Sequence, residues 1–509
     1  MKYRSLPLAR TVLAVLVAVV CAAEAWAALP APIAYWSFDN DPDRQINDLT
    51  GNSNAGVWFD AGPLSPGFDA DVPSQIGSGR SLLFDDAGDA RTNQQYVALD
   101  MSFSGTGALP QMTASAWFRT SFSGPPTGPT AQEFNWAIID FDRSEYFDLY
   151  VRDTDGAIGF STNHGGAAAN VHDMVGNTTG LNDGDWHHVL AVYDGTDKRL
   201  YVDGLPDGTA SNPHGGNPLG STLPRFGYVG DGSEATQFND GIEGSGAGAD
   251  NGRNDFYYDG RIDDVAVWDV ALSAGDIAAL YAGTSPAEGL APLPTLAPGA
   301  YTIDFESLAA VPENSVISNR ISGMTFDGAT LVFPGGSPAF GFGSAFGNDT
   351  PKSGEPAGGA MITDISDVNA SPNPVGGSPF SPITVTWNGM AVEDLTFQVV
   401  DIDGGHVFTA RVYDAVEGGN LLHTLVVNDG DPDTGDGIAT PIDFGGYTDI
   451  RRLEIVMFNS GGVSGFAADN FSFTVLPAGP IIIPEPSTQV VWSLLAGLGI
   501  GVGCRRRRR

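Results

Sequence analysis

The sequence has 509 residues, of which 67 are glycine and 34 are proline; 42% are hydrophobic and only 17% are charged. This length exceeds that of one ordinary domain, so we expect two or three, and the hydrophobic content excludes an intrinsically disordered chain. The net charge is −37, which argues against binding to nucleic acid or to an anionic membrane surface.

The charge is distributed unevenly along the chain. Eight of the 24 basic residues lie in the two ends, whereas residues 28–484 carry 59 acidic and 16 basic residues. Such an acidic surface suits bound Ca²⁺, whose ligands are mostly carboxylate and carbonyl oxygens, although acidity can also serve solubility alone. Both cysteines, Cys21 and Cys504, lie in the end segments. We therefore expect a folded body without a disulfide.

Residues 1–27 have the features of a signal peptide. Cationic residues precede an apolar run at 12–23, and small residues then form an A-x-A cleavage pattern that ends at Ala27. A retained membrane anchor is the alternative, but the apolar run is short for a membrane span. We expect the mature chain to begin near Ala28 and to be exported across the inner membrane.

The body of the chain is predicted to be all-β. Short runs of Val, Ile, Phe, Tyr and Trp alternate with Asp-Gly, Asn-Gly and Gly-Gly turns. One short helix is expected at 272–283, with Ser273 as its N-cap. The segment 286–299 contains several prolines and is predicted to be a stiff linker between a first domain at 28–285 and a second at 300–477.

Three stretches of the first domain occur together in a specific order. IAYWSFDN opens it, DWHHVLAVYDGTDKRLYVDG (185–204) lies in the middle, and GRIDDVAVWDVALS closes it. Together they resemble the laminin-G-like family of the concanavalin A-like jelly roll. The resemblance implies two antiparallel sheets packed face to face, with the first and last strands adjacent.

That adjacency would bring Asp39 close to Asp264. In relatives, acids at such positions often help to hold a Ca²⁺ ion between the chain ends, so the resemblance implies a structural calcium site at these two residues. Asp263 is the alternative to Asp264, because a bulge would change which side chain points inward. These acids could instead cap turns and face water.

The second domain opens with YTIDFESL and closes with FAADNFSFTVLP. Its ends loosely resemble those of jelly-roll carbohydrate-binding modules, in which such ends clasp a structural Ca²⁺. The resemblance implies a second β-sandwich with Glu306 and Asp469 as calcium ligands.

Two tyrosines are candidates for contacting a carbohydrate. Tyr257 and Tyr258 follow a long loop at 230–255 that is rich in glycine and acidic residues. Loops at the rim of a β-sandwich often carry binding sites. Packing of both rings in the core is the alternative.

The segment DFDRSE (140–145) is similar to the E-x-D-x-x-E constellation of glucanases on the same fold, in which two carboxylates act as nucleophile and general acid. Here the first acid is Asp140, whose side chain is one methylene shorter than glutamate. The surrounding sequence also fits an ordinary hairpin. His187 and His188 are neighbours in a predicted strand, point to opposite faces and cannot chelate a metal together. We predict that the protein is not an enzyme.

The C-terminus has three parts: a P-E-P-S motif, an apolar segment that reaches Val502, and five arginines. The apolar segment with its flanks is about 17 residues long, near the short limit for a transmembrane helix. The arginines must then stay in the cytoplasm. The tail therefore predicts that the exported body is first held at the inner membrane.

This arrangement closely resembles the PEP-CTERM sorting signal. The matching residues are Pro484, Glu485, Pro486, Ser487, Arg505, Arg506, Arg507, Arg508 and Arg509 within the segment 484–509. The resemblance implies processing by an exosortase and passage to the cell surface. An ordinary membrane anchor would leave P-E-P-S unexplained.

The combined prediction is an exported cell-surface or extracellular-matrix protein whose β-sandwich domains bind exopolysaccharide or another surface ligand. Two alternatives remain open at this point. The protein could be a glycan-active enzyme on a jelly-roll scaffold, or a purely structural surface protein without a specific ligand.

Overall fold

The computed structural model describes the chain in segments. These are residues 29–39, 41, 45–60, 67–84, 95–121, 135–236, 238, 252–253, 258–308, 316–332, 361–364, 382–400, 405–432, 439–459 and 467–477. The predicted signal peptide and sorting signal lie outside the described residues. Within the described segments, no helix has both the length and the apolar character needed to cross a membrane.

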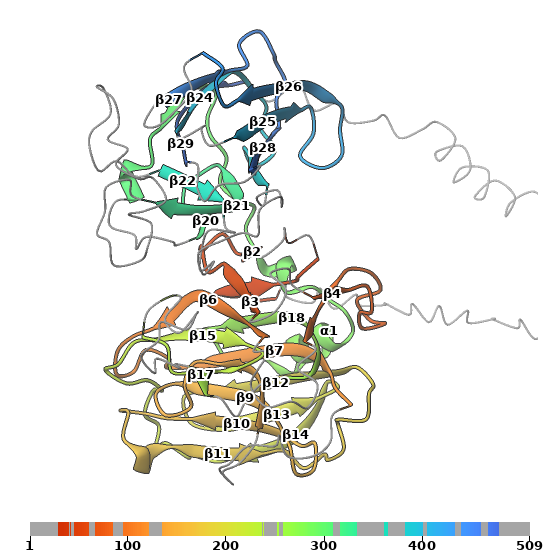
Figure 1. The fold of residues 1–509 in the computed structure, drawn as a ribbon. Helices are drawn as coiled ribbons and strands as arrows, with labels where there is room; N and C mark the ends of the chain where they lie inside the picture. Colours follow the sequence, from red (N-terminus) through yellow and green to blue (C-terminus); the bar gives the residue numbers. More distant parts are fainter. Residues whose placement is uncertain are drawn as a thin grey trace, which may run out of the picture.

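The first domain is a sandwich of two antiparallel sheets (Figure 1). Sheet 1 has the strand order β14-β13-β12-β7-β18-β5-β4, and β1 pairs with β18. Its strands are β1 (Ala34–Trp36), β4 (Phe68–Asp69), β5 (Ser81–Phe84), β7 (Met112–Arg119), β12 (His187–Tyr193), β13 (Lys198–Val202), β14 (Leu205–Ala210) and β18 (Gly260–Trp268). The pairing of β1 with β18 confirms that the first and last strands of this domain are adjacent.

Sheet 2 has the order β11-β10-β9-β8-β15-β6-β3-β2. Its strands are β2 (Gln45–Ile46), β3 (Gly56–Asp60), β6 (Gln95–Phe103), β8 (Asn135–Asp140), β9 (Phe147–Arg152), β10 (Ile158–Thr162), β11 (His172–Val175) and β15 (Arg225–Val229). A short 3₁₀ helix, η1 (Ala168–Asn170), precedes β11, and β16 (Gly232–Ser233) pairs with β17 (Gly252–Arg253).

Strand β12 shows why its sequence is apolar on both faces. Val189 and Ala191 point into the core between the two sheets, whereas Leu190 and Val192 pack under the helix α1 (Ala274–Tyr281). The helix begins where the sequence predicts, because the Ser273 side chain accepts a hydrogen bond from the Asp276 backbone N–H and the Asp276 side chain accepts from Ser273 in return.

The second domain differs from the predicted two-sheet sandwich. Its described residues form one antiparallel sheet of 11 strands that curls into a nearly closed, barrel-like layer (Figure 1). The strands are β19 (Gly299–Ile303), β20 (Val316–Ser318), β21 (Thr325–Val332), β22 (Met361–Asp364), β23 (Ile383–Thr386), β24 (Val392–Val400), β25 (His406–Tyr413), β26 (Leu421–Asn428), β27 (Ala439–Asp443), β28 (Arg452–Asn459) and β29 (Ala467–Val475). Two 3₁₀ helices, η2 (Pro286–Gly289) and η3 (Glu306–Leu308), flank β19.

A bend in β21 connects the part of the sheet that contains β23 with the part that contains β22. Its first half, through Asp327, pairs with β23, and its second half, from Ala329, pairs with β22. Gly328 lies between them at φ +75°, a conformation that residues with a Cβ rarely adopt. One strand therefore serves both layers, and the sheet remains continuous.

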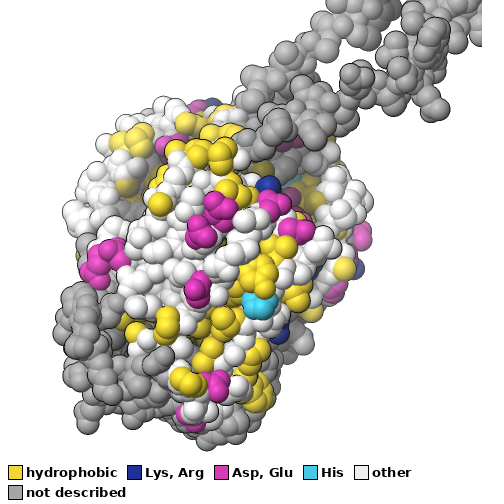
Figure 2. All heavy atoms as spheres, turned by 90° about the horizontal axis from the view of Figure 1, so that it is seen from above, with side chains coloured by type: hydrophobic (Ala, Val, Ile, Leu, Met, Phe, Trp, Pro, Cys, Tyr) yellow, Lys and Arg dark blue, Asp and Glu magenta, His cyan; other side chains and the backbone are white. Residues whose placement is uncertain are grey.

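The two domains have separate hydrophobic cores that share no residue. They touch where Ala55 and Val57 pack against Val316 and where Arg320 forms an ion pair with Asp100. Figure 2 views the molecule from the end formed by the second domain, where acidic side chains are spread over the surface beside a band of hydrophobic side chains. Leu421, on the strand β26 of this domain, is 51% exposed.

Candidate functional site

The predicted calcium ligands of the first domain lie together. Asp264 sits at φ +48° where the register of β18 shifts, and its Oδ1 accepts a hydrogen bond from the Tyr35 hydroxyl at 2.5 Å. Burial, followed by the charges of Asp264 and Asp39, raises the pKa of Asp263 to about 9. Burial and the charge of Asp39 outweigh the Tyr35 hydrogen bond and raise the pKa of Asp264 to about 7. The charge of Asp39 therefore acts on both neighbours in β18.

These carboxylates are oxygen donors of the kind that Ca²⁺ prefers, but each already has a protein partner. Asp39 Oδ1 accepts from the Arg80 backbone N–H at 2.9 Å, and Asp263 Oδ1 accepts from the Asp264 backbone N–H at 2.9 Å. Among the described residues, no three His, Cys, Asp or Glu side chains are arranged to hold a metal ion. Calcium at Asp39 and Asp264 stays a prediction.

The predicted ligands of the second domain occupy different environments. Glu306 is exposed in η3, whereas Asp469 is only 3% exposed in β29, opposite Gln398 of β24. Calcium at this pair also stays a prediction.

The tyrosine prediction requires a correction. Tyr258 is fully buried in the first core, where its ring meets the edge of Phe84 at a centroid distance of 5.9 Å. A ring with no exposed face cannot stack on a sugar, so Tyr258 has the core-packing role that the sequence left as the alternative. Tyr257 lies outside the described residues.

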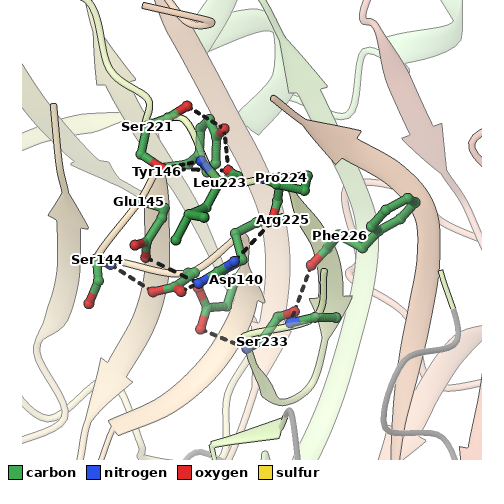
Figure 3. Close-up of polar contacts among 12 residues, drawn as sticks. Asp140, Ser144, Glu145, Tyr146, Ser221, Leu223, Pro224, Arg225, Phe226 and Ser233 are labelled. Atoms are coloured by element: carbon green, nitrogen blue, oxygen red, sulfur yellow. Dashed lines mark hydrogen bonds and ion pairs between the residues drawn. The ribbon is translucent and has the colours of Figure 1, made fainter. Parts of the chain in front are cut away.

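Two of the three glucanase-like acids, Asp142 and Glu145, lie against Arg225, and all three acids are buried (Figure 3). Asp142 sits in the turn between β8 and β9 at φ +61°, and its Oδ1 accepts from the Ser144 backbone N–H at 2.8 Å. Its Oδ2 accepts from Arg225 Nε at 2.7 Å, and Arg225 also lies 3.8 Å from Glu145. Asp140 Oδ2 accepts from the Ser233 backbone N–H at 2.9 Å.

Burial dominates the electrostatics of this cluster. Burial, then the hydrogen bond and charge of Asp142, raises the pKa of Glu145 to about 8. Asp142 is held by Arg225 and by the backbone N–H of Ser144, and Asp140 is held by the backbone N–H of Ser233, so these acids are bonded within the hairpin and to its neighbours. The arrangement fits the hairpin interpretation of DFDRSE.

The two neighbouring histidines point to opposite faces of β12, as predicted. Burial lowers the pKa of His188 to about 3, and its Nε2 lies 2.9 Å from Ser115 Oγ. His187 contacts two acids, with its Nδ1 2.9 Å from Asp203 and its Nε2 3.3 Å from Asp183. Burial alone would lower the pKa of His187, but the hydrogen bonds and charges of these acids raise it overall.

The raised pKa of His187 predicts a pH-dependent contribution to stability. The folded state binds this proton more tightly than the unfolded state, so the contribution is complete below the unfolded pKa of about 6.5 and is lost as the pH rises through the folded pKa. We expect the difference in free energy of unfolding between the wild type and His187→Gln to be largest near pH 6 and to shrink toward pH 8. Urea unfolding at a series of pH values measures it. A difference that grows with pH would refute the ion-pair assignment.

Sequence reasoning missed a polar rim at the ends of several strands of sheet 1. We define the polar rim as Asp69, Asp71, Arg119, Trp186 and Arg261. Trp186 Nε1 donates to Asp71 Oδ1 at 3.1 Å, and Arg119 pairs with the same carboxylate. Arg261 donates to Asp69 from Nε at 3.1 Å and lies 3.6 Å from Asp71. Hydrogen bonds from Arg261 lower the pKa of Asp69.

The register of the strands builds this rim. Arg119 ends β7 and pairs across the sheet with Arg261 near the start of β18, while Trp186 immediately precedes β12. The four charged side chains are between 25% and 36% exposed, and Trp186 is partly exposed. The rim therefore offers an indole ring and several hydrogen-bonding groups to solvent at one place.

A family model matches most of the first domain. Residues 91–278 match the family model of the Concanavalin A-like lectin/glucanases superfamily, Laminin_G_3. The first sandwich carries a concanavalin A-like lectin/glucanase domain. The match confirms the laminin-G-like resemblance of this part of the chain.

Several solved structures resemble the chain at low identity. Domain 4 of AbnA, an extracellular arabinanase of Geobacillus stearothermophilus in complex with arabinotriose, is 15% identical, with a TM-score of 0.33 over 50% of this chain and 100% of that one. The binding domain of Paraclostridial Mosquitocidal Protein 1 is 11% identical and has a TM-score of 0.33. The match covers 88% of this chain and 98% of that domain. A putative carbohydrate-binding protein of Bacteroides ovatus is 15% identical and has a TM-score of 0.21. The match covers 36% of this chain and 44% of that protein. The chain matches no curated protein.

Proposed function

We propose that the protein is exported, sorted to the cell surface by an exosortase acting on its C-terminal segment, and binds a polysaccharide through the concanavalin A-like domain. The observation that carries the binding proposal is the match of residues 91–278 to a superfamily of lectins and glucanases. The sequence of residues 484–509 and the signal-peptide pattern of residues 1–27 support the destination. Ca²⁺ at Asp39 and Asp264 would hold the ends of this domain together.

The polar rim is the surface of this domain that best suits a sugar. Sugars present apolar ring faces edged by hydroxyl groups, so a binding site combines an aromatic face with a few placed polar groups. Trp186 supplies the aromatic face, and the carboxylates and guanidinium groups around it supply acceptors and donors. The mutual ion pairs of the rim hold these groups in position without ligand.

Replacing Trp186 with alanine should lower the affinity for polysaccharide about tenfold, because stacking on an aromatic ring is worth about 1.5 kcal/mol. The measurement is retention of the chain by exopolysaccharide of the native organism, followed by a glycan array. Leu205→Ala is the matched control, since Leu205 is 69% exposed on β14 of the same sheet but outside the rim.

Binding by the wild type that is weakened in Trp186→Ala and kept in Leu205→Ala supports the proposal. No binding to any glycan would favour a purely structural surface protein. Release of reducing sugar that disappears in Glu145→Gln would favour the alternative of a glycan-active enzyme, which the raised pKa of the buried Glu145 carboxyl would suit.

A further inference from the structure

Two acidic side chains meet at the contact between the domains. Asp41 follows β1 in the first domain and is 7% exposed; Asp327 lies in β21 of the second domain. Asn47 contacts both: its backbone N–H donates to Asp41 Oδ1 at 2.8 Å, and its side chain hydrogen-bonds Asp327. The two carboxylates therefore flank one asparagine across the domain boundary.

Neighbouring amides fix this arrangement. Gln45 Oε1 accepts from the backbone N–H of Gly328, the residue after Asp327, at 2.7 Å. The side-chain nitrogen of Gln45 donates to Asn47 Oδ1. The short strand β2 and its following residues thus hold the second domain's β21 against the first domain through oxygen-rich side chains.

Among the described residues, one oxygen of each carboxylate has no hydrogen-bond partner. Asp41 Oδ2 and Asp327 Oδ1 are both buried and without such a partner. Arg80 is a nearby cation, but its NH2 donates to the backbone carbonyl of Asp41 at 2.9 Å and its Nε to that of Asp39 at 2.7 Å. The guanidinium therefore anchors the backbone of this segment and leaves the two carboxylate oxygens open.

Two buried carboxylate oxygens without hydrogen-bond partners are stabilised by a proton or a cation. Burying a carboxylate oxygen without a partner is costly, and a second carboxylate beside it adds like-charge repulsion. Either a shared proton or a bound cation removes this penalty.

We propose that Asp41 Oδ2 and Asp327 Oδ1 hold a Ca²⁺ ion that bridges the two domains. The available donors are the two carboxylate oxygens, because the side-chain oxygens of Gln45 and Asn47 already accept hydrogen bonds. Ca²⁺ accepts such oxygen ligands with water in a flexible shell of about 6–8, whereas borderline transition metals favour nitrogen and sulfur. This site is separate from the one predicted at Asp39 and Asp264, because it takes a ligand from each domain.

The test is calorimetric titration of the full chain with Ca²⁺ after treatment with a chelator. The wild type should bind about one more Ca²⁺ per chain than either Asp41→Asn or Asp327→Asn, since each variant removes one charged ligand. Asp264→Asn is the matched control, and this variant should still bind the Ca²⁺ ion proposed at Asp41 and Asp327. Far-UV circular dichroism confirms that each variant is folded.

A second readout separates a bridging ion from a shared proton. In X-ray scattering, chelation should increase the radius of gyration of the wild type. It should not change the radius of gyration of Asp41→Asn or Asp327→Asn. If Asp41→Asn and Asp327→Asn bind as much Ca²⁺ as the wild type and chelation alters no radius, the carboxylates share a proton and the calcium bridge is refuted. Glycan binding is not part of either readout, so this proposal can fail without affecting the proposed function.

Discussion

Replacing Arg225 with methionine should lower the free energy of unfolding of the first domain by about 3–5 kcal/mol, because removing one partner leaves a buried charge uncompensated. The side chains of Arg225, Asp142 and Glu145 are only 11%, 3% and 9% exposed. Methionine keeps the aliphatic stem of the arginine but none of its donors. Urea unfolding followed by circular dichroism measures the change.

Arg199→Met is the matched control. Arg199 pairs with Asp194 at 2.5 Å in the same domain but is 33% exposed, so its loss should cost less than about 1 kcal/mol. Adding Asp142→Asn to the Arg225 variant should recover part of the stability, because asparagine removes the charge and tolerates the positive φ at this turn. Equal losses in the two arginine variants would show that the buried ion pair does not stabilise the hairpin.

Replacing Phe471 with alanine should destabilise the second domain by about 3–5 kcal/mol through loss of packing and creation of a cavity. Phe471 is fully buried; its ring stacks on Phe397 at 4.8 Å and meets the edges of Phe305 and Phe326 at 5.9 and 6.1 Å. Hydrogen exchange should accelerate in β24 and β29 but not in β12, since the two cores share no residue.

Phe458→Ala provides the control for this substitution. Phe458 is 40% exposed on β28 of the same sheet, so its truncation should change the free energy of unfolding by only about 0.5 kcal/mol. Accelerated exchange in β12 of the Phe471 variant would contradict the separation of the two cores and indicate one cooperative unit.

The sequence predicted those parts of the fold that depend on local patterns. The apolar stretch after Trp186, the Ser273 cap and the pairing of the first and last strands all appear in the first domain. Each rests on signals within a few residues or on three stretches specific to one family. The same signals predicted that the second domain is built mainly of strands, but not how its strands pair.

Features that depend on non-local pairing could not be predicted. Gly328 looks like any turn glycine in the sequence, and only the two partners of β21 show that it joins the layers of a continuous sheet. The residues of the polar rim are far apart in the sequence, between Asp69 and Arg261, and the register of sheet 1 brings them together. The prediction that Tyr258 contacts a ligand is wrong. Tyr258 lies just before β18, and the face to which its side chain points depends on where that strand begins, which the sequence does not show. The Asp41–Asp327 pair needs contact between two domains.

Mass spectrometry of the native protein from separated cell fractions tests the central claim most directly. A chain exported and sorted as proposed should be found outside the cytoplasm, with its N-terminus near Ala28 and without the arginines at 505–509. Recovery of the full-length chain, with those arginines, dissolved in the cytosol would contradict the account.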